Sequence, residues 1–230
     1  RARGGHGVDL ATVNFKDGDG LLQALECRTT DAVVFLSGQG RSYTVEAANL
    51  PSGRGDGQPI NAIVSCEGDE IVWMGHGDPQ QLLLMHHSGG NGFLCRLGDL
   101  VTRTKVGKDF MSVPEGAKLI APVRAATGEP DKNAMVAALS SDARLLLFPV
   151  DEVPLRPNGG VGVQLLALPD KASLAAAAVI DGKALAVSGV KRSKRSVVTL
   201  DAKALEEYEG KRAQRGRVCD VGFRPDRLGG

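Results

Sequence analysis

The chain has 230 residues, of which 42% are hydrophobic, 24% charged and 4% aromatic, and its formal net charge is +1. This composition excludes an intrinsically disordered chain, and the length is ample for the buried core of one large domain. No apolar run reaches about 18 residues, and the N-terminal residues lack the apolar segment of a signal peptide. We therefore expect neither a membrane span nor secretion.

Glycine-rich loops recur along the chain at a nearly constant interval, and almost every loop carries a basic residue beside its glycines. One glycine per loop serves as an anchor, and the steps between anchors are 50, 52, 53 and 56 residues; the anchors are Gly5, Gly55, Gly107, Gly160 and Gly216. An interval of this size is the signature of a repeat architecture. The predicted repeats lie near 1–50, 51–103, 104–155 and 156–210, with a closing segment at 211–230.

Between the loops, an apolar segment enters a polar turn and returns as a second apolar segment, which is the pattern of a β-hairpin. The four predicted hairpins lie at 32–45, 81–95, 135–148 and 183–200. Their turns are expected at 37–41, 86–91, 140–144 and 188–194. Each hairpin leads into a step from acidic to apolar residues, which predicts a tight or one-turn helical exit near Leu50, Leu100, Val153 and Leu205. Otherwise only 201–208 and 170–176 have helical periodicity.

A glycine-rich repeat of short strands predicts blades arranged around an axis. A single blade cannot bury both of its faces, so several blades must pack together. We expect an all-β, propeller-like fold of about five four-stranded blades that forms one domain over 1–230. The chain opens on a loop with no hairpin before it, so the N-terminal blade is expected to be incomplete or open.

The cysteines and histidines show no metal or disulfide pattern. Cys27, Cys66, Cys95 and Cys219 are far apart in sequence and form no Cys-x-x-Cys pair, so we expect reduced thiols in an intracellular protein. None of the four histidines lies at zinc-ligand spacing from a cysteine. We expect no metal site.

Several separated motifs resemble one family. They are Gly40-Arg41-Ser42-Tyr43, Leu50 through Ile60, Gly92 through Cys95, Asp99 through Val101 with Gly107-Lys108, and Leu147 through Val150. In this order they resemble the C-terminal domain of the A subunit of bacterial DNA topoisomerase IV, and the similarity runs through nearly the whole chain. The C-terminal domain of the DNA gyrase A subunit is similar. The resemblance implies a β-pinwheel, a propeller-like fold whose blades exchange strands and whose basic rim bends or wraps DNA.

The two branches of this family differ in a glycine-rich box. Gyrase carries Gln-Arg-Arg-Gly-Gly-Lys-Gly, and the first seven residues here, Arg1 to Gly7, match it at four positions. The segment Arg156 to Gly162 keeps only the glycines of the box. These departures favour topoisomerase IV over gyrase, and a shallow bend over a full wrap.

No catalytic residue is expected in this chain. It has no nucleophile elbow, His-Glu-x-x-His pair or P-loop. His86-His87-Ser88 falls in a predicted turn, where adjacent residues cannot act as base and orienting acid, and Asp17 to Gly20 lacks the later ligands of a calcium loop. Tyr43 and Tyr208 lack the arginine and metal-carboxylate neighbours of a DNA-cleaving tyrosine, which the resemblance places outside this chain. Trp73 is expected in the core, and the few aromatics disfavour single-strand binding.

Basic residues, by contrast, recur once per repeat and gather near the C-terminus. Residues 191–230 carry a charge balance of +5, against −4 for residues 1–190. Cations spaced around a rim suit a curved phosphate backbone, and adjacent glycines let backbone N–H groups approach phosphates. The predicted DNA-binding residues are Arg1, Arg3, Arg41, Arg54, Lys105, Lys108, Arg144, Arg156, Lys191, Arg192, Lys194, Arg195, Arg212, Arg215 and Arg217. Acidic residues such as Glu67, Asp69 and Glu70 are expected to make some blades poor at DNA contact.

The resemblance implies a non-catalytic, DNA-bending part of a type IIA topoisomerase that helps to select DNA crossings for decatenation and relaxation. The implied partners are double-stranded DNA, the N-terminal cleavage part of the same polypeptide, and the B subunit of the topoisomerase, in the bacterial cytoplasm near the nucleoid and with no membrane. The domain itself needs no cofactor, whereas ATP and Mg²⁺ are implied for the whole enzyme. Two alternatives stay open, a gyrase-type wrapping domain and a propeller that binds proteins.

Overall fold

The structure is a computed structural model that describes residues 4–5, 15, 17–18, 20–51, 57–66, 68–129 and 133–229. The chain divides into two compact units. Unit 1 comprises Arg1–Gly77 and Leu100–Phe110, and unit 2 comprises Asp78–Asp99 and Met111–Gly230. The sequence predicted one domain with repeat boundaries near residues 50, 103, 155 and 210, and these boundaries stay predictions.

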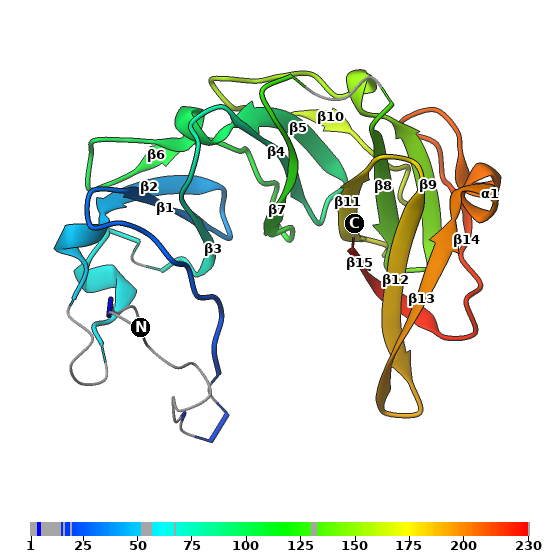
Figure 1. Ribbon diagram of the computed structural model, residues 1–230, viewed down its shortest axis with the longest axis horizontal. Coiled ribbons are helices and arrows are strands. Elements are labelled where there is room, and N and C mark those ends of the chain that lie inside the picture. Colours follow the sequence, from blue (N-terminus) through cyan, green and yellow to red (C-terminus); the bar gives the residue numbers. More distant parts are fainter. Residues whose placement is uncertain are drawn as a thin grey trace. The chain divides into compact units, whose positions relative to one another are not determined.

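The fold is all-β, as the sequence predicted, and each of the four predicted hairpins belongs to one antiparallel sheet (Figure 1). Sheet 1, in unit 1, has the strand order β3-β1-β2-β6. Its strands are β1 (Ala32–Ser37), β2 (Arg41–Glu46), β3 (Ile71–Gly75) and β6 (Lys108–Asp109). The hairpin β1–β2 is thus flanked by two strands from later in the chain.

Unit 2 holds the other three sheets, and they repeat this arrangement. Sheet 2 has the order β10-β5-β4-β7 and sheet 3 the order β11-β8-β9-β14, whereas sheet 4 has three strands in the order β13-β12-β15. The bounds for sheet 2 are β4 (Gln81–His87), β5 (Asn91–Arg96), β7 (Leu119–Thr127) and β10 (Val163–Gln164). Those for sheets 3 and 4 are β8 (Met135–Ser140), β9 (Arg144–Pro149), β11 (Leu174–Ile180), β14 (Arg217–Val218), β12 (Ala184–Lys191), β13 (Lys194–Asp201) and β15 (Arg224–Gly229).

The described residues therefore form four sheets where the sequence predicted about five blades. The closing segment 211–230 forms no blade of its own, because β14 completes sheet 3 and β15 joins sheet 4. The incomplete N-terminal blade expected from the sequence falls largely on residues outside the described part of the chain. Among the described residues, no helix is long and apolar enough to cross a membrane.

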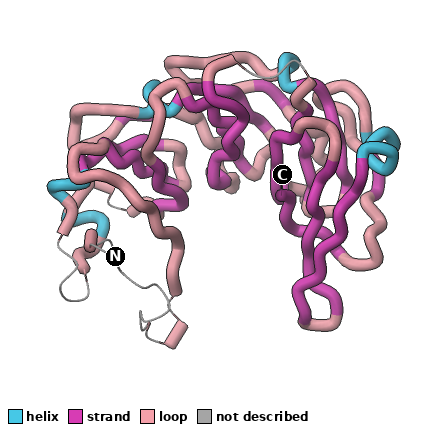
Figure 2. The backbone as a smooth tube through the Cα atoms, viewed as in Figure 1, coloured by secondary structure: helices cyan, strands magenta, loops and turns pink. Residues whose placement is uncertain are grey.

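Short helical turns follow each hairpin, as predicted (Figure 2). They are the 3₁₀ turns Ala47–Asn49, Leu97–Leu100 and Val150–Glu152, and the helix α1 (Ala202–Leu205) with the 3₁₀ turn Glu206–Tyr208; another 3₁₀ turn covers Ile60–Ala62. Asp201 begins α1 as its N-cap, since its carboxylate accepts a hydrogen bond of 2.9 Å from the backbone N–H of Ala204. The prediction of a helix at 170–176 was wrong, because the apolar run from Leu174 forms the strand β11, which pairs with β8.

The fourth hairpin also differs from its prediction. We expected a long turn over 188–194, but β12 and β13 pair without a break from Ala184–Asp201 to Lys191–Lys194. The turn itself is only Arg192-Ser193, whose φ angles of 48° and 65° are those of a type I′ hairpin turn. The four cations of this segment thus lie on the end of a ribbon rather than on a loop.

The sheets of unit 2 pack face to face, and β8 supplies side chains to both interfaces. Val136 and Ala138 belong to a buried cluster that joins sheets 2 and 3. The alternate residues Ala137 and Leu139 belong to a second cluster, which joins sheets 3 and 4. This alternation follows from the two-residue period of a strand, so both faces of sheet 3 are buried.

The inner and outer edges of unit 2 follow from strand contacts. The strands β7 and β15 both contact β11, so β7, β11 and β15 form an inner edge. On the far side of each sheet lie β10, β14 and β13. We call these three strands, with the loops that precede β10 and β14, the outer edge of unit 2.

The two-residue strands β6, β10 and β14 each begin directly after a glycine in the left-handed conformation. These glycines are Gly107, Gly162 and Gly216, with φ between 69° and 76°. A Cβ at Gly216 would lie 2.6 Å from the carbonyl oxygen of Leu145, so only glycine lets the outer strand approach its hairpin. The structural equivalent of Gly107 is thus Gly162, two residues beyond the anchor chosen from the sequence.

We expect Gly216→Ala to lower the free energy of unfolding by at least about 2 kcal/mol, because alanine in the left-handed region costs about 1–2 kcal/mol before any steric clash. Urea denaturation measures this loss. Gly182→Ala is the matched control, since Gly182 has φ 78° but its Cβ would meet only the oxygen of Asn133, at 3.9 Å. Equal losses in the two variants would show that close strand approach at Gly216 adds nothing.

Candidate nucleic-acid interface

Exposed cations recur on the outer edge of unit 2. Arg156 lies in the loop before β10, where its backbone N–H donates to the oxygen of Leu94 at 2.7 Å and its side chain is exposed. On sheet 3, Arg215 precedes β14 and Arg217 lies on it, and both are exposed. The predicted cations thus recur on the outer edges of sheets 2 and 3, although Arg156 lies well before Gly162 whereas Arg215 and Arg217 directly flank Gly216.

Two of these predicted residues have partners within the protein. Arg212 donates from Nη1 to the oxygen of Gln164 at 2.7 Å, and its backbone N–H donates to the Glu152 carboxylate at 2.9 Å. Arg215 Nη2 lies 4.0 Å from an Asp142 oxygen, but its side chain stays 57% exposed. Arg212 is therefore bound to β10 and to the 3₁₀ turn that follows β9, whereas Arg215 can turn toward an anion at small cost.

Arg41 and Arg144 occupy the same position in two hairpins, and both hold an outer strand in place. Arg41 forms an ion pair of 2.6 Å with Asp109 on β6 and donates to the oxygen of Val106 at 2.8 Å. Arg144 donates to the oxygen of Gly216 at 3.1 Å, directly before β14. The sequence predicted DNA binding for both arginines, and their contacts indicate a structural role as well.

We expect Arg144→Gln to lower the free energy of unfolding by roughly 1 kcal/mol, because it removes a charged hydrogen bond from a mostly buried side chain. Duplex affinity should fall less than in Arg217→Gln, whose side chain is exposed on the same outer edge. Urea denaturation and a titration of fluorescent duplex measure the two effects. A larger affinity loss in Arg144→Gln, with stability unchanged, would contradict the structural role.

In unit 1 fewer of the predicted cations are available. Lys105 is exposed in a turn, whereas Lys108 Nζ donates to the oxygen of Val101 at 3.2 Å and lies 5.3 Å from the centre of the Phe110 ring. Arg1, Arg3 and Arg54 lie outside the described residues. Asp69 accepts a hydrogen bond of 3.3 Å from the backbone of Gln39, so its carboxylate supports the turn of sheet 1. Glu70 is exposed, and Glu67 lies outside the described residues.

The end of the β12–β13 ribbon, Lys191 to Lys194, is the hairpin tip, and it is exposed throughout. Lys191 and Lys194 face each other across the ribbon, and like charges in such a pair are destabilising. Arg195 differs, because its Nη1 donates to both carboxylate oxygens of Asp226 at 2.8 Å. A phosphate near the tip would relieve the repulsion among Lys191, Arg192 and Lys194.

Sequence reasoning missed Arg224 and Arg227, which the structure places beside the ribbon. Arg224 pairs with Val190 in the β12–β15 register, and its Nη2 donates to the oxygen of Ser141 at 2.6 Å. Arg227 pairs with Ser188 and is exposed. Both arginines look isolated in the sequence, because only strand pairing brings them next to the other cations.

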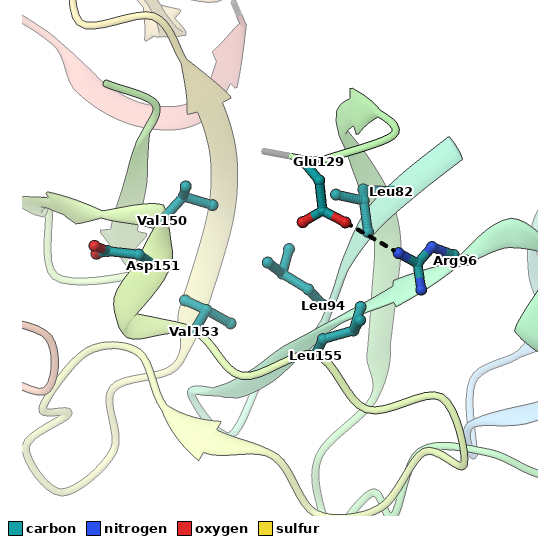
Figure 3. A pocket seen from close by; sticks show the side chains of 8 residues that line it. All are labelled: Leu82, Leu94, Arg96, Glu129, Val150, Asp151, Val153 and Leu155. Atoms are coloured by element: carbon teal, nitrogen blue, oxygen red, sulfur yellow. Dashed lines mark hydrogen bonds and ion pairs between the residues drawn. The ribbon is translucent and has the colours of Figure 1, made fainter. Parts of the chain in front are cut away.

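The described residues offer no arrangement suited to catalysis. A pocket of about 110 Å³ in unit 2 has mostly apolar walls and one ion pair, Arg96 with Glu129 at 3.4 Å (Figure 3). Its lining residues are Leu82, Leu94, Arg96, Glu129, Val150, Asp151, Val153 and Leu155. No group of three or more His, Cys, Asp or Glu residues in the described part of the chain is placed to hold a metal ion.

The tyrosines and the tryptophan are structural. Tyr43 is buried on β2, and burial raises its pKa. Arg41 lies close to the Tyr43 hydroxyl and partly opposes this rise in its pKa. Tyr208 is also buried, and burial raises its pKa to about 12, in contact with Cys219. Trp73 is half-buried on β3, with its ring against Gly75.

His86 and His87 are not in a solvated turn, as the sequence suggested, but at the buried end of β4. The apolar run before them continues as a strand, so only Ser88 to Gly90 make the turn. Burial lowers the pKa of both imidazoles, that of His86 to about 4. The four cysteines are free, with Cys27 exposed and the other three buried.

Comparisons with known proteins agree with this fold. The C-terminal domain of ParC from E. coli is 29% identical, superposes with a TM-score of 0.84, and is matched over 100% of this chain and 93% of its own. The C-terminal domain of DNA gyrase A shares the fold, with a TM-score of 0.66 at 17% identity over 96% of this chain and 72% of its own. The family model described as the DNA gyrase C-terminal domain, a beta-propeller, matches residues 134–181.

Two curated relatives from different bacteria carry the same name. The A subunit of DNA topoisomerase 4 from Neisseria gonorrhoeae is 33% identical over 226 residues, which is 96% of this chain and 29% of that protein. The protein of the same name from Escherichia coli K12 is 31% identical over 99% of this chain and 30% of its own length. The chain thus spans under a third of the length of these relatives. It is a homologue of the A subunit of DNA topoisomerase IV, and it corresponds to the C-terminal β-pinwheel domain, a non-catalytic region of that protein.

Proposed function

We propose that this chain binds and bends duplex DNA for a bacterial type IIA topoisomerase. The observation that carries the proposal is the recurrence of exposed cations on the outer edges of three successive sheets of unit 2. They are Arg156 on sheet 2, Arg215 and Arg217 on sheet 3, and the hairpin tip on sheet 4. Lys and Arg side chains on successive sheets can follow a phosphate backbone without reading its sequence.

A bend requires several such contacts at once. Bending about 20–30 bp of DNA by 40–90° costs of order 1–6 kcal/mol, which one basic turn cannot offset. Cations on neighbouring sheets supply the contacts together, and the outer edge grows more basic from sheet 2 to sheet 4. The proposal therefore predicts that the chain binds duplex DNA with a modest affinity, which falls with salt and increases with duplex length.

The role in the whole enzyme follows from homology. Within the full-length polypeptide, this domain would hold one duplex segment so that the cleavage part selects crossings for decatenation and relaxation. The N-terminal cleavage part and the B subunit would be its partners in the bacterial cytoplasm. ATP and Mg²⁺ would serve those other parts, and this domain would need no cofactor.

The test is duplex affinity as a function of salt for two lengths, about 15 bp and about 40 bp. Phosphate binding predicts a linear log–log plot with a slope of about −0.9 for each contact. The longer duplex should bind more tightly than its extra sites alone explain, and with a steeper slope. Absence of binding to either length at low salt would overturn the proposal and favour a protein-binding propeller.

Binding can also be separated from gyrase-type wrapping. A nicked circle sealed in the presence of stoichiometric protein changes its linking number if the DNA is wrapped with one handedness. We expect little change, because the closer structural match is to ParC and the gyrase box is incomplete. A large change would favour the wrapping function.

A further inference from the structure

Sheet 4 has one face that no other described sheet covers. Its inner face carries Leu185 and Val187, which are buried against sheet 3. The opposite face of the β12–β13 ribbon points away from that cluster, and no described strand pairs with the free edge of β13. In sheets 1 to 3 the equivalent strand is covered by β6, β10 or β14.

The strand register gives the composition of this open face. Val190 lies opposite Arg195, and Ser188 lies between Val197 on one side and Arg227 on the other. The two valines are 52% and 62% exposed. An open face that combines exposed valines with arginines is neither a core surface nor an ordinary solvated one.

The ribbon has dimensions that suit a DNA groove. The major groove is about 12 Å wide and admits a two-stranded β-ribbon, whereas the minor groove is about half as wide. Its base edges offer guanine acceptors to arginine and thymine methyl groups to apolar side chains. Phosphates line both sides of the groove, where the exposed cations Lys191, Arg192 and Lys194 of the hairpin tip would meet them.

We propose that the β12–β13 ribbon enters the major groove, with Val190 and Val197 against thymine methyl groups and Arg227 toward base edges. Arg195 lies opposite Val190 on the same face, and its side chain is held by Asp226. The inference rests on the proposed function, since it presupposes that the chain binds duplex DNA. It adds a groove contact, and hence a mild preference for particular bases, to a rim that holds phosphates alone.

A second copy of the chain is the competing occupant, because the free edge of β13 could pair with its counterpart. Such edge pairing would extend the sheet in its own plane and leave the face with Val190 and Val197 exposed. A groove covers that face and also neutralises the hairpin tip. The observations therefore favour DNA.

Replacing thymine by uracil tests the contact directly. Uracil lacks the C5-methyl group in the major groove, and the phosphates stay the same. The wild-type chain should bind an A·T-rich 40-bp duplex with thymine about fourfold more tightly, for each methyl group buried, than the same duplex with uracil. The double variant Val190→Ser, Val197→Ser should bind both duplexes equally, while Val101→Ser, at an exposed valine of unit 1, should keep the discrimination.

The outcomes are distinguishable. Equal wild-type affinity for both duplexes would overturn the groove contact and leave the proposed function standing, and so would discrimination that survives in the double variant. No binding to either duplex would instead refute the proposed function. A wild-type dimer in sedimentation without DNA, absent in the double variant, would assign the face to a second copy. Circular dichroism confirms that the double variant folds.

Discussion

Neutralising the hairpin tip is expected to weaken duplex binding by roughly 100-fold at about 0.1 M salt. The variant is Lys191→Gln, Arg192→Gln, Lys194→Gln, and Arg195 is kept because Asp226 already pairs with it. Each phosphate contact contributes a log–log slope of about −0.9, which corresponds to about tenfold in affinity at 0.1 M salt. Removing two or three phosphate contacts together gives the stated effect, and the salt slope should become shallower by about 2–3.

The fold should survive this change, because all three side chains are exposed. Removing the repulsion between Lys191 and Lys194 should leave the free energy of unfolding unchanged or slightly higher. The matched control removes the same charge elsewhere, with Lys118→Gln, Lys171→Gln and Lys183→Gln, which adjoin β7, β11 and β12 and not the outer edge. If both triple variants bound duplex equally weakly, net charge rather than the tip would explain the binding.

The repeat could be predicted from the sequence because each exchanged outer strand requires a glycine at a fixed place. An outer strand needs a left-handed glycine where it approaches its hairpin, so Gly107 and Gly216 recur at nearly fixed spacing. The first three hairpins were readable because each buries an apolar strand on either side of a polar turn, whereas the second strand of the fourth hairpin, β13, is mostly exposed. Three predictions were wrong because they came from local composition: the turn at 86–91, the long turn at 188–194 and the helix at 170–176. Strand pairing decided the last two of these segments, since β12 and β13 pair up to Lys191–Lys194 and β11 pairs with β8.

The candidate site was readable only in part. Periodic position identifies where a cation falls in the repeat, but it does not show what the side chain contacts. Arg41 and Arg217 illustrate the difference, since one pairs with Asp109 while the other is exposed. Arg227 shows the opposite case, because nothing near it in sequence indicates that β15 lies beside β12.

The basic residues fall into two groups, those that stabilise the fold and those that are free to bind DNA. Arg41 and Arg144, each at the start of a second hairpin strand, hold the outer strand, whereas Arg215 and Arg217, before and on β14, are exposed. Sheet 4 has no described outer strand, so its second hairpin strand itself is exposed and carries the tip. The most basic surface therefore falls where strand exchange ends, which is where a bound duplex would meet the ribbon.

The unfolding free energy should fall by about 3 kcal/mol between pH 6.5 and pH 4 because of His86 alone. Burial lowers its pKa from 6.5 to about 4 in the folded state. Between these values the unfolded chain binds a proton that the folded chain excludes, so acid favours unfolding, and the stability is fully present above pH 6.5. The pKa of His87 is lowered by the same cause and shifts stability in the same direction.

Contacts within β4 explain why the fold does not compensate a charge on His86. Its Nδ1 lies 3.2 Å from the oxygen of Leu84, which accepts the ring proton, and its Nε2 is buried without a partner among the described residues. A second proton on Nε2 would thus be buried with no acceptor. Urea denaturation from pH 4 to pH 8 measures the effect in the wild type and in His86→Leu.

In the variant His86→Leu, the free energy of unfolding should change less with pH than in the wild type, since leucine cannot take up the proton in either state. At pH 8, where both histidines are neutral, it should be at least as stable as the wild type, because it removes a buried nitrogen that lacks a partner. His76→Gln serves as the control, since His76 lies in unit 1, 3.4 Å from Asp31, and should leave this acid loss in place. A profile in His86→Leu as steep as that of the wild type would show that another group governs the acid sensitivity.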